Sequence, residues 1–142
     1  MRFWDSSGVL PLLVDELTSE ELERLFLADP RIIVWWGTEL ECRSALARRD
    51  RLRESTVAQL EEGLQRLATL RATWQEVSPS LALRTSAMRL VAAYDLRAAD
   101  ALQLAAALAA AAGEPGSLPF VCLDRRLRAA AELEGFATLA LP

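Results

Sequence analysis

The feature that most constrains the fold of this chain is an alternation of short apolar runs with longer helical segments. Helices separate the runs, and a strand–helix–strand connection within one sheet makes its strands parallel. We therefore expect an α/β fold, a three-layer α/β/α sandwich with a central parallel sheet. The runs that we interpret as buried strands are residues 2–4, 31–35, 74–77, 118–123 and 136–139.

Local signals mark the starts of the helices. Residues 18–21 and 38–41 both follow the capping-box pattern and predict helices to about residues 27 and 49. Apolar residues spaced by three and four predict a long amphipathic helix over about residues 54–72. Further helices are expected from Ser78-Pro79 to about residue 93, over about 98–112, and in a short segment after Asp124.

The chain has 142 residues, of which 52% are hydrophobic and 25% are charged. This length and composition predict one globular domain spanning residues 1–142. No apolar run is long enough to cross a bilayer, and Cys42 and Cys122 form no zinc or disulfide spacing. We expect a cytoplasmic protein with no membrane association and no secretory leader, in which both cysteines are reduced and mostly buried.

The charged residues limit the chemistry that is available. The formal net charge is −4, and the sequence contains neither Lys nor His. Base catalysis by His and His-ligated metals are therefore excluded, and all positive side-chain charge comes from Arg, which suits bidentate phosphate contacts. An acidic protein binds nucleic acid poorly unless its Arg residues are grouped and a metal offsets its acidic site.

Three acidic residues each have a structural and a functional interpretation. Asp5 follows the first strand, where it is either a turn residue or part of a site. Asp124 follows the strand over 118–123, where it is a helix N-cap or a site residue. Glu41 is the last residue of the second capping box, and that role alone would explain it.

Asp100 is harder to explain structurally. It shares a helical face with Leu104 and Leu108, so the helix directs it inward. An acidic residue early in a helix interacts favourably with the helix dipole. A carboxylate on an apolar face also needs a partner that offsets its desolvation, and here that partner is an Arg or a cation.

The four carboxylates can meet at one place. In an open parallel sheet, ligands bind outside the C-terminal ends of the strands, and this edge can collect Asp5, Glu41, Asp100 and Asp124. Carboxylates that share a site repel one another unless a hard dication such as Mg²⁺ or Mn²⁺ lies among them. Water held by such a metal can attack a phosphodiester, and that chemistry needs no His.

These motifs together resemble the PIN domain, in particular the VapC-type ribonuclease toxins, over essentially the whole chain. The matching segments are "FWDSSGVLPLL", "GTELECRSALARR", "LRAADALQLAAAL" and "FVCLDRRLRAAAELEGF", in this order. The resemblance implies that Asp5, Glu41, Asp100 and Asp124 bind Mg²⁺ or Mn²⁺, and that Ser7 orients a ligand or the water.

The same resemblance implies a function and partners. The chain would be a metal-dependent ribonuclease that cleaves RNA phosphodiester bonds, the toxin of a type II toxin–antitoxin pair. Its partners would be RNA and a cognate antitoxin, with no membrane, and the resemblance also allows a homodimer. An antitoxin segment would dock beside a projecting hairpin formed by the helices over 38–49 and 54–72, unless their apolar residues belong to the protein's own core.

Two segments depart from the family pattern. Cys122 stands two residues before Asp124, where Thr or Ser is common, and a thiol is the weaker hydrogen-bond donor. Trp35-Trp36 is bulkier than expected before Thr38. Core packing explains such a pair, and base stacking near a cleft is the functional alternative.

The Arg residues divide into two groups. Arg48, Arg49, Arg51 and Arg53 are typical of a solvated turn between helices, with phosphate contact as the alternative. Arg125, Arg126 and Arg128 follow Asp124 and are the better candidates for holding substrate phosphates or pairing with the carboxylates.

Two other functions remain open. One is a catalytically silent PIN-fold module that binds RNA or a partner protein. The other is a phosphatase of the haloacid dehalogenase type, which also begins with a carboxylate after its first strand. That class normally has a second Asp two residues later and a Lys, whereas this chain has Ser7 and no Lys.

Overall fold

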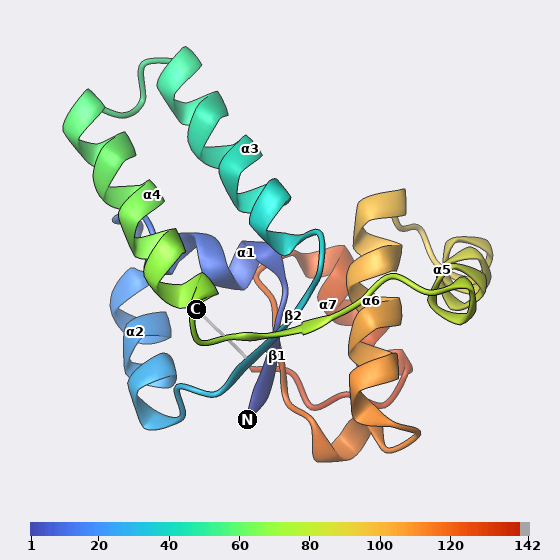
Figure 1. Ribbon diagram of the computed structural model, residues 1–142. Coiled ribbons are helices and arrows are strands. Elements are labelled where there is room, and N and C mark those ends of the chain that lie inside the picture. Colours follow the sequence, from blue (N-terminus) through green and yellow to red (C-terminus); the bar gives the residue numbers. More distant parts are fainter. Residues whose placement is uncertain (140–142) are drawn as a thin grey trace.

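The computed structural model describes residues 1–139 and contains a parallel sheet with helices on both faces (Figure 1). The strand order is β3–β2–β1–β4, and every adjacent pair is parallel. This arrangement confirms the α/β sandwich expected from the sequence. The strands are β1 (Arg2–Trp4), β2 (Ile32–Trp35), β3 (Gln75–Val77) and β4 (Phe120–Val121).

The prediction of a strand over residues 136–139 is wrong. Only an isolated parallel bridge joins Thr138 to Phe120 among the residues described. The edge strand β4 is two residues long, so it offers little backbone for another strand to pair with. Phe136 instead packs its ring against Phe120, with the ring centroids 5.5 Å apart.

The helices form two layers. On one face lie α1 (Ser6–Val9), α2 (Ser19–Ala28), α3 (Thr38–Arg51) and α4 (Val57–Arg71), with the short 3₁₀ turn η1 (Leu10–Leu12). On the other face lie α5 (Leu81–Ala93), α6 (Ala98–Ala111) and α7 (Arg125–Leu133), and the 3₁₀ turn η2 (Pro115–Ser117) follows α6. Within residues 1–139, no helix combines the length and apolar character needed to span a membrane.

The strands alternate between two hydrophobic cores. Phe3, Ile33 and Trp35 pack toward α5 and α6, whereas Trp4 and Val34 pack toward α2, α3 and α4. Successive side chains of a strand point to opposite faces, so a strand buried on both sides is apolar throughout. This explains why β2 appears in the sequence as a continuous apolar run, whereas the partly exposed edge strand β3 is not apolar throughout.

Helices α3 and α4 form a hairpin that projects beyond the sheet (Figure 1). A capping box between Thr56 and Gln59 starts α4. The apolar stripe of α4 serves the protein's own core, because Leu67 is fully buried and Leu64 is half-buried against that core. Val57, at the outer end of the stripe, is 70% exposed. The stripe therefore leaves little apolar surface for a partner.

The capping boxes expected at residues 18–21 and 38–41 are wrong. Thr18 makes no side-chain capping bond, and the Oγ of Ser19, the first residue of α2, instead accepts a hydrogen bond from the Glu16 amide at 2.8 Å. Thr38 lies inside α3 after Gly37, and its hydroxyl accepts a hydrogen bond from Gln103. Similarly, Ser80 rather than Ser78 caps α5. Glu41 is thus free of a capping role.

Candidate active site

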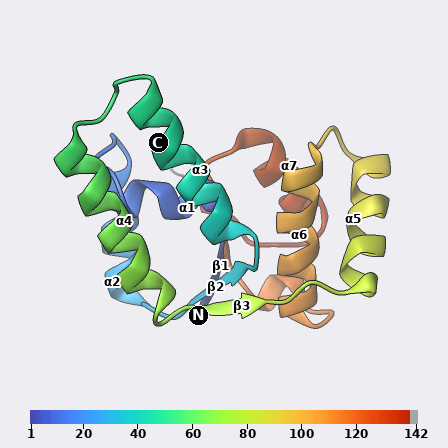
Figure 2. The same ribbon diagram turned by 45° about the horizontal axis from the view of Figure 1, so that its top comes forward.

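The acidic residues lie at the C-terminal edge of the sheet, where α1, α3, α6 and α7 begin (Figure 2). Asp5 follows β1 directly, and Glu41 lies in the first turn of α3. Asp100 lies in the first turn of α6, and Asp124 follows β4 as the N-cap of α7. The sheet topology therefore brings all four predicted residues to one edge, as parallel strands do with their carboxyl ends.

Asp5 is the most buried of these carboxylates, with 3% of its surface exposed. Its Oδ1 accepts hydrogen bonds from Ser7 Oγ at 2.8 Å and from the Gly8 amide at 3.1 Å. Burial raises the pKa of Asp5 to about 7, and the charge of Glu41 also raises it, while the bonds from Ser7 and Gly8 lower it. Asp5 is therefore both a turn residue and a desolvated acid.

Gly8 allows the first helix to approach the sheet closely. A Cβ at this position would lie 2.9 Å from the backbone oxygen of Val121. The Asp5 amide donates to the same Val121 oxygen at 3.1 Å. Any larger residue in place of Gly8 would push α1, and Asp5 with it, away from the end of β4.

Ser7 joins the ends of β1 and β4. Its Oγ donates to Asp5 and accepts hydrogen bonds from the Leu123 amide at 2.8 Å and the Asp124 amide at 3.3 Å. The Sγ of Cys122 lies 3.8 Å from the same hydroxyl and donates to the Asp124 carbonyl oxygen at 3.4 Å. The buried thiol thus supports this turn only through long sulfur contacts, and Ser7 provides the shorter bonds.

Glu41 is half-buried and held by side chains of two other helices. Its Oε2 accepts from Ser6 Oγ at 2.7 Å, and its Oε1 accepts from Gln103 Nε2 at 3.1 Å. Gln103 Nε2 also donates to Thr38 Oγ1 at 3.1 Å. Burial raises the pKa of Glu41, these hydrogen bonds lower it, and the charge of Asp100 raises it further.

Ser6, Thr38 and Gln103 are site residues that the sequence analysis did not identify. Gln103 is almost fully buried, and it is the polar residue in an otherwise Ala- and Leu-rich helix. It follows Asp100 by three residues, which places both on one helical face. A lone amide on the apolar face that carries a candidate ligand is the signal that could have revealed it.

Asp100 and Asp124 form a more open part of the edge. Burial raises the pKa of the half-buried Asp100, and the negative charge of Asp124 raises it as well. Asp124 is exposed, and its Oδ1 accepts a hydrogen bond from the Leu127 amide at 2.9 Å. The N-cap interpretation of Asp124 is therefore confirmed, and it is compatible with a place in the site.

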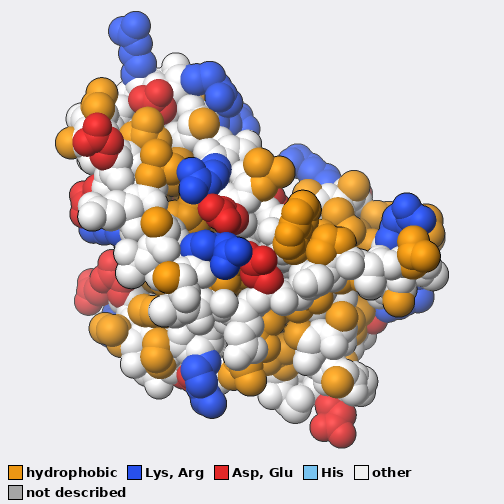
Figure 3. Space-filling model, in the orientation of Figure 1, with side chains coloured by type: hydrophobic (Ala, Val, Ile, Leu, Met, Phe, Trp, Pro, Cys, Tyr) orange, Lys and Arg blue, Asp and Glu red, His pale blue; other side chains and the backbone are white. Residues whose placement is uncertain are grey.

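Two neighbouring hollows open onto this edge. The first, about 600 Å³ in volume, is lined by Glu41 and Asp100, with Leu10, Leu40 and Ala45 as its apolar wall. The second is lined by Asp100 and Asp124. In Figure 3 the surface steps inward between the α3–α4 hairpin and α6. A substrate can therefore approach the acidic residues from solvent.

Arg side chains surround the hollows without forming an ion pair to any of the four carboxylates among the residues described. Arg97 lines both hollows, Arg48 lines the first, and Arg125 and Arg126 line the second. Arg128 lines neither of the two. Arg126 pairs weakly with Asp95 at 3.5 Å. These guanidinium groups are placed for phosphate contacts at the rim.

The oxygen atoms of the four carboxylates form a set of ligands that suits a hard cation. Within residues 1–139, none of the four carboxylates takes part in an ion pair. Carboxylate and hydroxyl oxygens are the ligands that Mg²⁺ and Mn²⁺ prefer. Over the same residues, no three acidic or cysteine side chains gather closely enough to hold a metal as they stand. The four carboxylates thus lie along one edge of the sheet and do not gather at a single point.

The two tryptophans before α3 differ in their surroundings. Trp35 is buried in the core beneath α5 and α6, which agrees with core packing. Trp36 is 56% exposed. A packing role therefore accounts for Trp35 alone.

No family model matches this sequence, and no curated protein matches it either. Solved structures do resemble it. VapC20 of Mycobacterium tuberculosis, a "Sarcin-Ricin loop cleaving toxin", aligns with a TM-score of 0.70 at 16% identity, over 96% of this chain and 97% of that chain. FitAcB from Neisseria gonorrhoeae aligns with a TM-score of 0.65 at 14% identity, over 98% and 96% of the two chains.

A toxin–antitoxin complex from Klebsiella pneumoniae aligns with a TM-score of 0.61 at 17% identity, over 87% of each chain. The chain shares the fold of these structures. This confirms the PIN-like fold that the sequence motifs implied.

Proposed function

We propose that this protein is a metal-dependent ribonuclease and the toxin of a toxin–antitoxin pair. The observation that carries the proposal is a row of four carboxylates at the ligand-binding edge of the sheet, with no Arg paired to any of them among residues 1–139. A buried acid such as Asp5, left without a positive partner, favours a bound cation. The fold shared with VapC20 supports the same activity.

Each part of the site has a distinct task under this proposal. Asp5, Glu41, Asp100 and Asp124 would hold Mg²⁺ or Mn²⁺, which supplies positive charge for activating water and for stabilising the phosphoryl oxygens. Ser7 fixes the orientation of Asp5 through its 2.8 Å bond. Ser6 and Gln103 fix the two oxygens of Glu41.

The Arg residues at the rim would bind the RNA backbone. Arg97 lies between the two hollows, and Arg126 lies beside Asp124. Guanidinium groups make bidentate contacts with phosphate, so these residues can hold the phosphates that flank the bond being cleaved. They also offset the repulsion between RNA and the acidic edge.

Cleavage of RNA by the purified protein in Mg²⁺ or Mn²⁺, and in excess EDTA, tests the proposal. We expect cleavage with either metal and none in the chelator. Equal cleavage in excess EDTA would contradict metal dependence. Binding of RNA without cleavage under every metal condition would favour the catalytically silent module instead.

The antitoxin partner is part of the same proposal. The apolar wall of the first hollow, formed by Leu10, Leu40 and Ala45, adjoins Glu41 and Asp100. An amphipathic helix could place its apolar face on this wall and an Arg among the carboxylates, where it would compete with the cation. The toxin–antitoxin complex with the same fold supports such a partner.

The product of a small reading frame directly upstream is the candidate inhibitor. Co-expression should yield a stable complex that no longer cleaves RNA. Full activity of this protein in the presence of that product would reject it as the antitoxin.

A further inference from the structure

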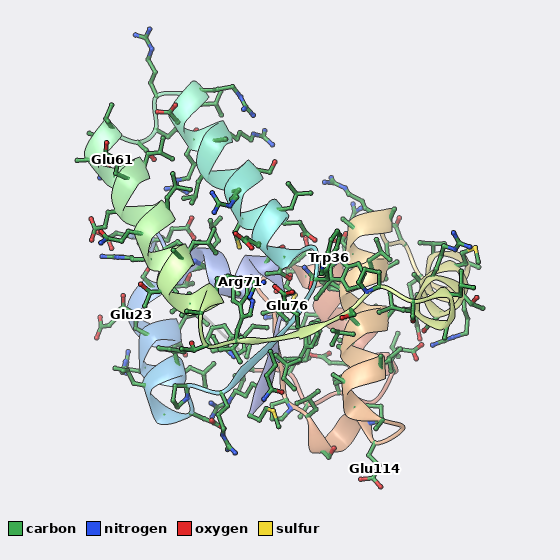
Figure 4. The ribbon with its side chains drawn as sticks, viewed as in Figure 1. Glu23, Trp36, Glu61, Arg71, Glu76 and Glu114 are labelled. Carbon is green, nitrogen blue, oxygen red and sulfur yellow. The ribbon has the colours of Figure 1, made fainter. Side chains whose placement is uncertain are left out.

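Trp36 is an exposed aromatic residue next to the acidic edge. It is 56% exposed, whereas Trp4, Trp35 and Trp74 are 0%, 7% and 7% exposed. Figure 4 shows Trp36 where the chain enters α3, close to α6. Large aromatic side chains dominate cores and interfaces, so an indole with more than half of its surface exposed beside a candidate site is a candidate for ligand contact.

The position of Trp36 is fixed by the sheet. Its amide donates to the Val77 carbonyl oxygen at 3.0 Å, which ties it to the end of β3. Its ring meets Trp35 edge-on, with the centroids 6.3 Å apart and the planes at 67°. Gly37 allows this packing, because a Cβ there would lie 2.6 Å from Trp35 Nε1. The indole is thus presented on a rigid support.

Trp36 lies within reach of a strand bound at the candidate active site. It precedes Glu41 by five residues, and Leu40 lies between them. Leu40 lines both the first hollow, with Glu41 and Asp100, and a further hollow that Trp36 lines. A single strand that leaves the acidic edge along the start of α3 therefore passes Leu40 and meets Trp36.

Arg84 provides a positive charge on the far side of the indole. It is exposed and lines an apolar hollow with Trp36 and Leu81. Within the described part of the chain, Arg84 makes no ion pair and no side-chain hydrogen bond. Its guanidinium group is therefore available for a phosphate.

The other Arg residues near Trp36 are engaged differently. Arg43 lies 3.1 Å from Glu39, and Arg71 lies 3.2 Å from Glu39 and 3.1 Å from Glu76. Figure 4 shows Arg71 and Glu76 side by side on this face. The Arg43–Glu39 pair lies within α3, whereas Arg71 joins α4 to α3 and to β3. Both guanidinium groups are thus engaged by carboxylates, so Arg84 is the better phosphate contact.

We propose that Trp36 and Arg84 form a subsite for one unpaired nucleotide of the RNA substrate. A base stacks on the indole, and Arg84 binds a phosphate of the same strand. Stacking requires a base that is free of its neighbours, so the subsite favours single-stranded over duplex RNA. The identity of the ligand as RNA rests on the proposed function, but the binding can be measured without cleavage.

Binding is measured with a short unstructured RNA oligonucleotide and its duplex, in Mg²⁺, with an Asp100→Asn background that prevents cleavage. We expect the single strand to quench tryptophan emission, and Trp36→Leu to weaken its binding by about 5- to 100-fold. Trp36→Phe, which keeps an aromatic face, should restore most of the affinity. Arg84→Gln should weaken binding and reduce its salt dependence.

Leu133→Ala is the matched control, because Leu133 is 75% exposed and lies outside all these hollows. It should leave binding unchanged. In the cleaving protein, Trp36→Leu should raise KM more than it lowers kcat, because the lost contact lies away from the reacting phosphate.

The possible outcomes of these experiments test the nucleotide subsite separately from the proposed ribonuclease activity. Unchanged affinity in Trp36→Leu overturns the subsite even if RNA is cleaved with metal. Quenching and weakened binding support it even if no RNA is cleaved. A protein that is dimeric in solution, with Trp36 shielded from acrylamide before RNA is added, would show that a second copy covers the indole and would also overturn the subsite.

Discussion

The acidic edge has an inner half, Asp5 and Glu41, and an outer half, Asp100 and Asp124, and the two are built differently. The inner carboxylates are buried or half-buried and accept hydrogen bonds from Ser6, Ser7 and Gln103. The outer carboxylates begin helices and lie beside Arg side chains. The inner carboxylates are therefore held in fixed orientations by hydrogen bonds, whereas the outer carboxylates are more accessible to solvent and substrate.

This difference has an energetic consequence. Desolvation raises the pKa of Asp5 and of Glu41, so ionising the inner half opposes folding of the metal-free protein. The exposed Asp124 also caps α7, so its loss removes a stabilising hydrogen bond. Removing the charge of Asp5 or Glu41 should therefore stabilise the folded metal-free protein, whereas removing the Asp124 carboxyl group should destabilise it.

The largest expected effect is that of Asp5→Asn. Asparagine keeps the Oδ1 that accepts from Ser7 and Gly8 but removes the buried charge. We expect cleavage of RNA in Mg²⁺ to fall by about 10³-fold, at the upper end of the range for one preorganised electrostatic contributor. Asp15→Asn, at an exposed residue that pairs with Arg66 at 3.7 Å, is the control and should cleave normally. Normal cleavage by Asp5→Asn would show that Asp5 only shapes the turn.

Asp100→Asn is expected to have the next largest effect. Cleavage should fall by at least about 10²-fold, because a charge that faces both hollows is lost. Thermal unfolding without metal should occur at the same or a higher temperature, since repulsion from Asp124 is relieved. A variant that unfolds, or that cleaves like the wild type, would make Asp100 a structural residue.

Gln103→Leu should have a smaller effect confined to the inner half. The change removes the donor to Glu41 and to Thr38 while keeping a buried side chain of similar size. Residues that orient a metal ligand typically contribute about 10- to 100-fold in metal affinity or activity, and we expect a loss in that range. Calorimetric titration with Mn²⁺ measures it. The Mn²⁺ affinity of Gln103→Glu should fall further than that of Gln103→Leu, because this change adds a like charge next to Glu41.

The smallest expected effect is the pH dependence of stability in the metal-free protein. The pKa of Asp5 is raised from 3.8 to about 7, so the folded state holds a proton that the unfolded state releases. Stability is therefore greatest below pH 4 for this group and falls as the pH rises toward 7.

Urea unfolding at pH 5 and pH 8 in EDTA tests this expectation, with Asp5→Asn as the control. The variant should lose much of the pH dependence of the wild type. Stability of the wild type that rises between pH 5 and pH 8 would contradict the assignment of a raised pKa to Asp5.

The sheet and the position of the site could be predicted from local patterns in the sequence. Strands buried on both faces appear as apolar runs; Asp5 directly follows β1, and Asp124 lies three residues after the end of β4. Four strands match the predicted segments to within a few residues. In place of the expected fifth strand there is one bridge from Thr138 to Phe120, because a strand needs a partner strand and the residues of one segment do not specify that partner.

The parts that could not be predicted depend on contacts between distant residues. Thr38 and Glu41 fit a capping box locally, but Gln103 binds both from another helix, 65 residues from Thr38 and 62 from Glu41. Ser6 similarly reaches Glu41 across 35 residues. Local spacing identifies the carboxylates, but it does not identify the neutral side chains that orient them.

The central claim is that this edge binds a metal that cleavage requires. Electron paramagnetic resonance of Mn²⁺, titrated into the protein while RNA cleavage is followed in the same samples, tests it most directly. We predict that the rate rises in proportion to bound Mn²⁺, and that Asp5→Asn reduces both together. Cleavage that is independent of bound Mn²⁺, or full Mn²⁺ binding by Asp5→Asn, would contradict the claim.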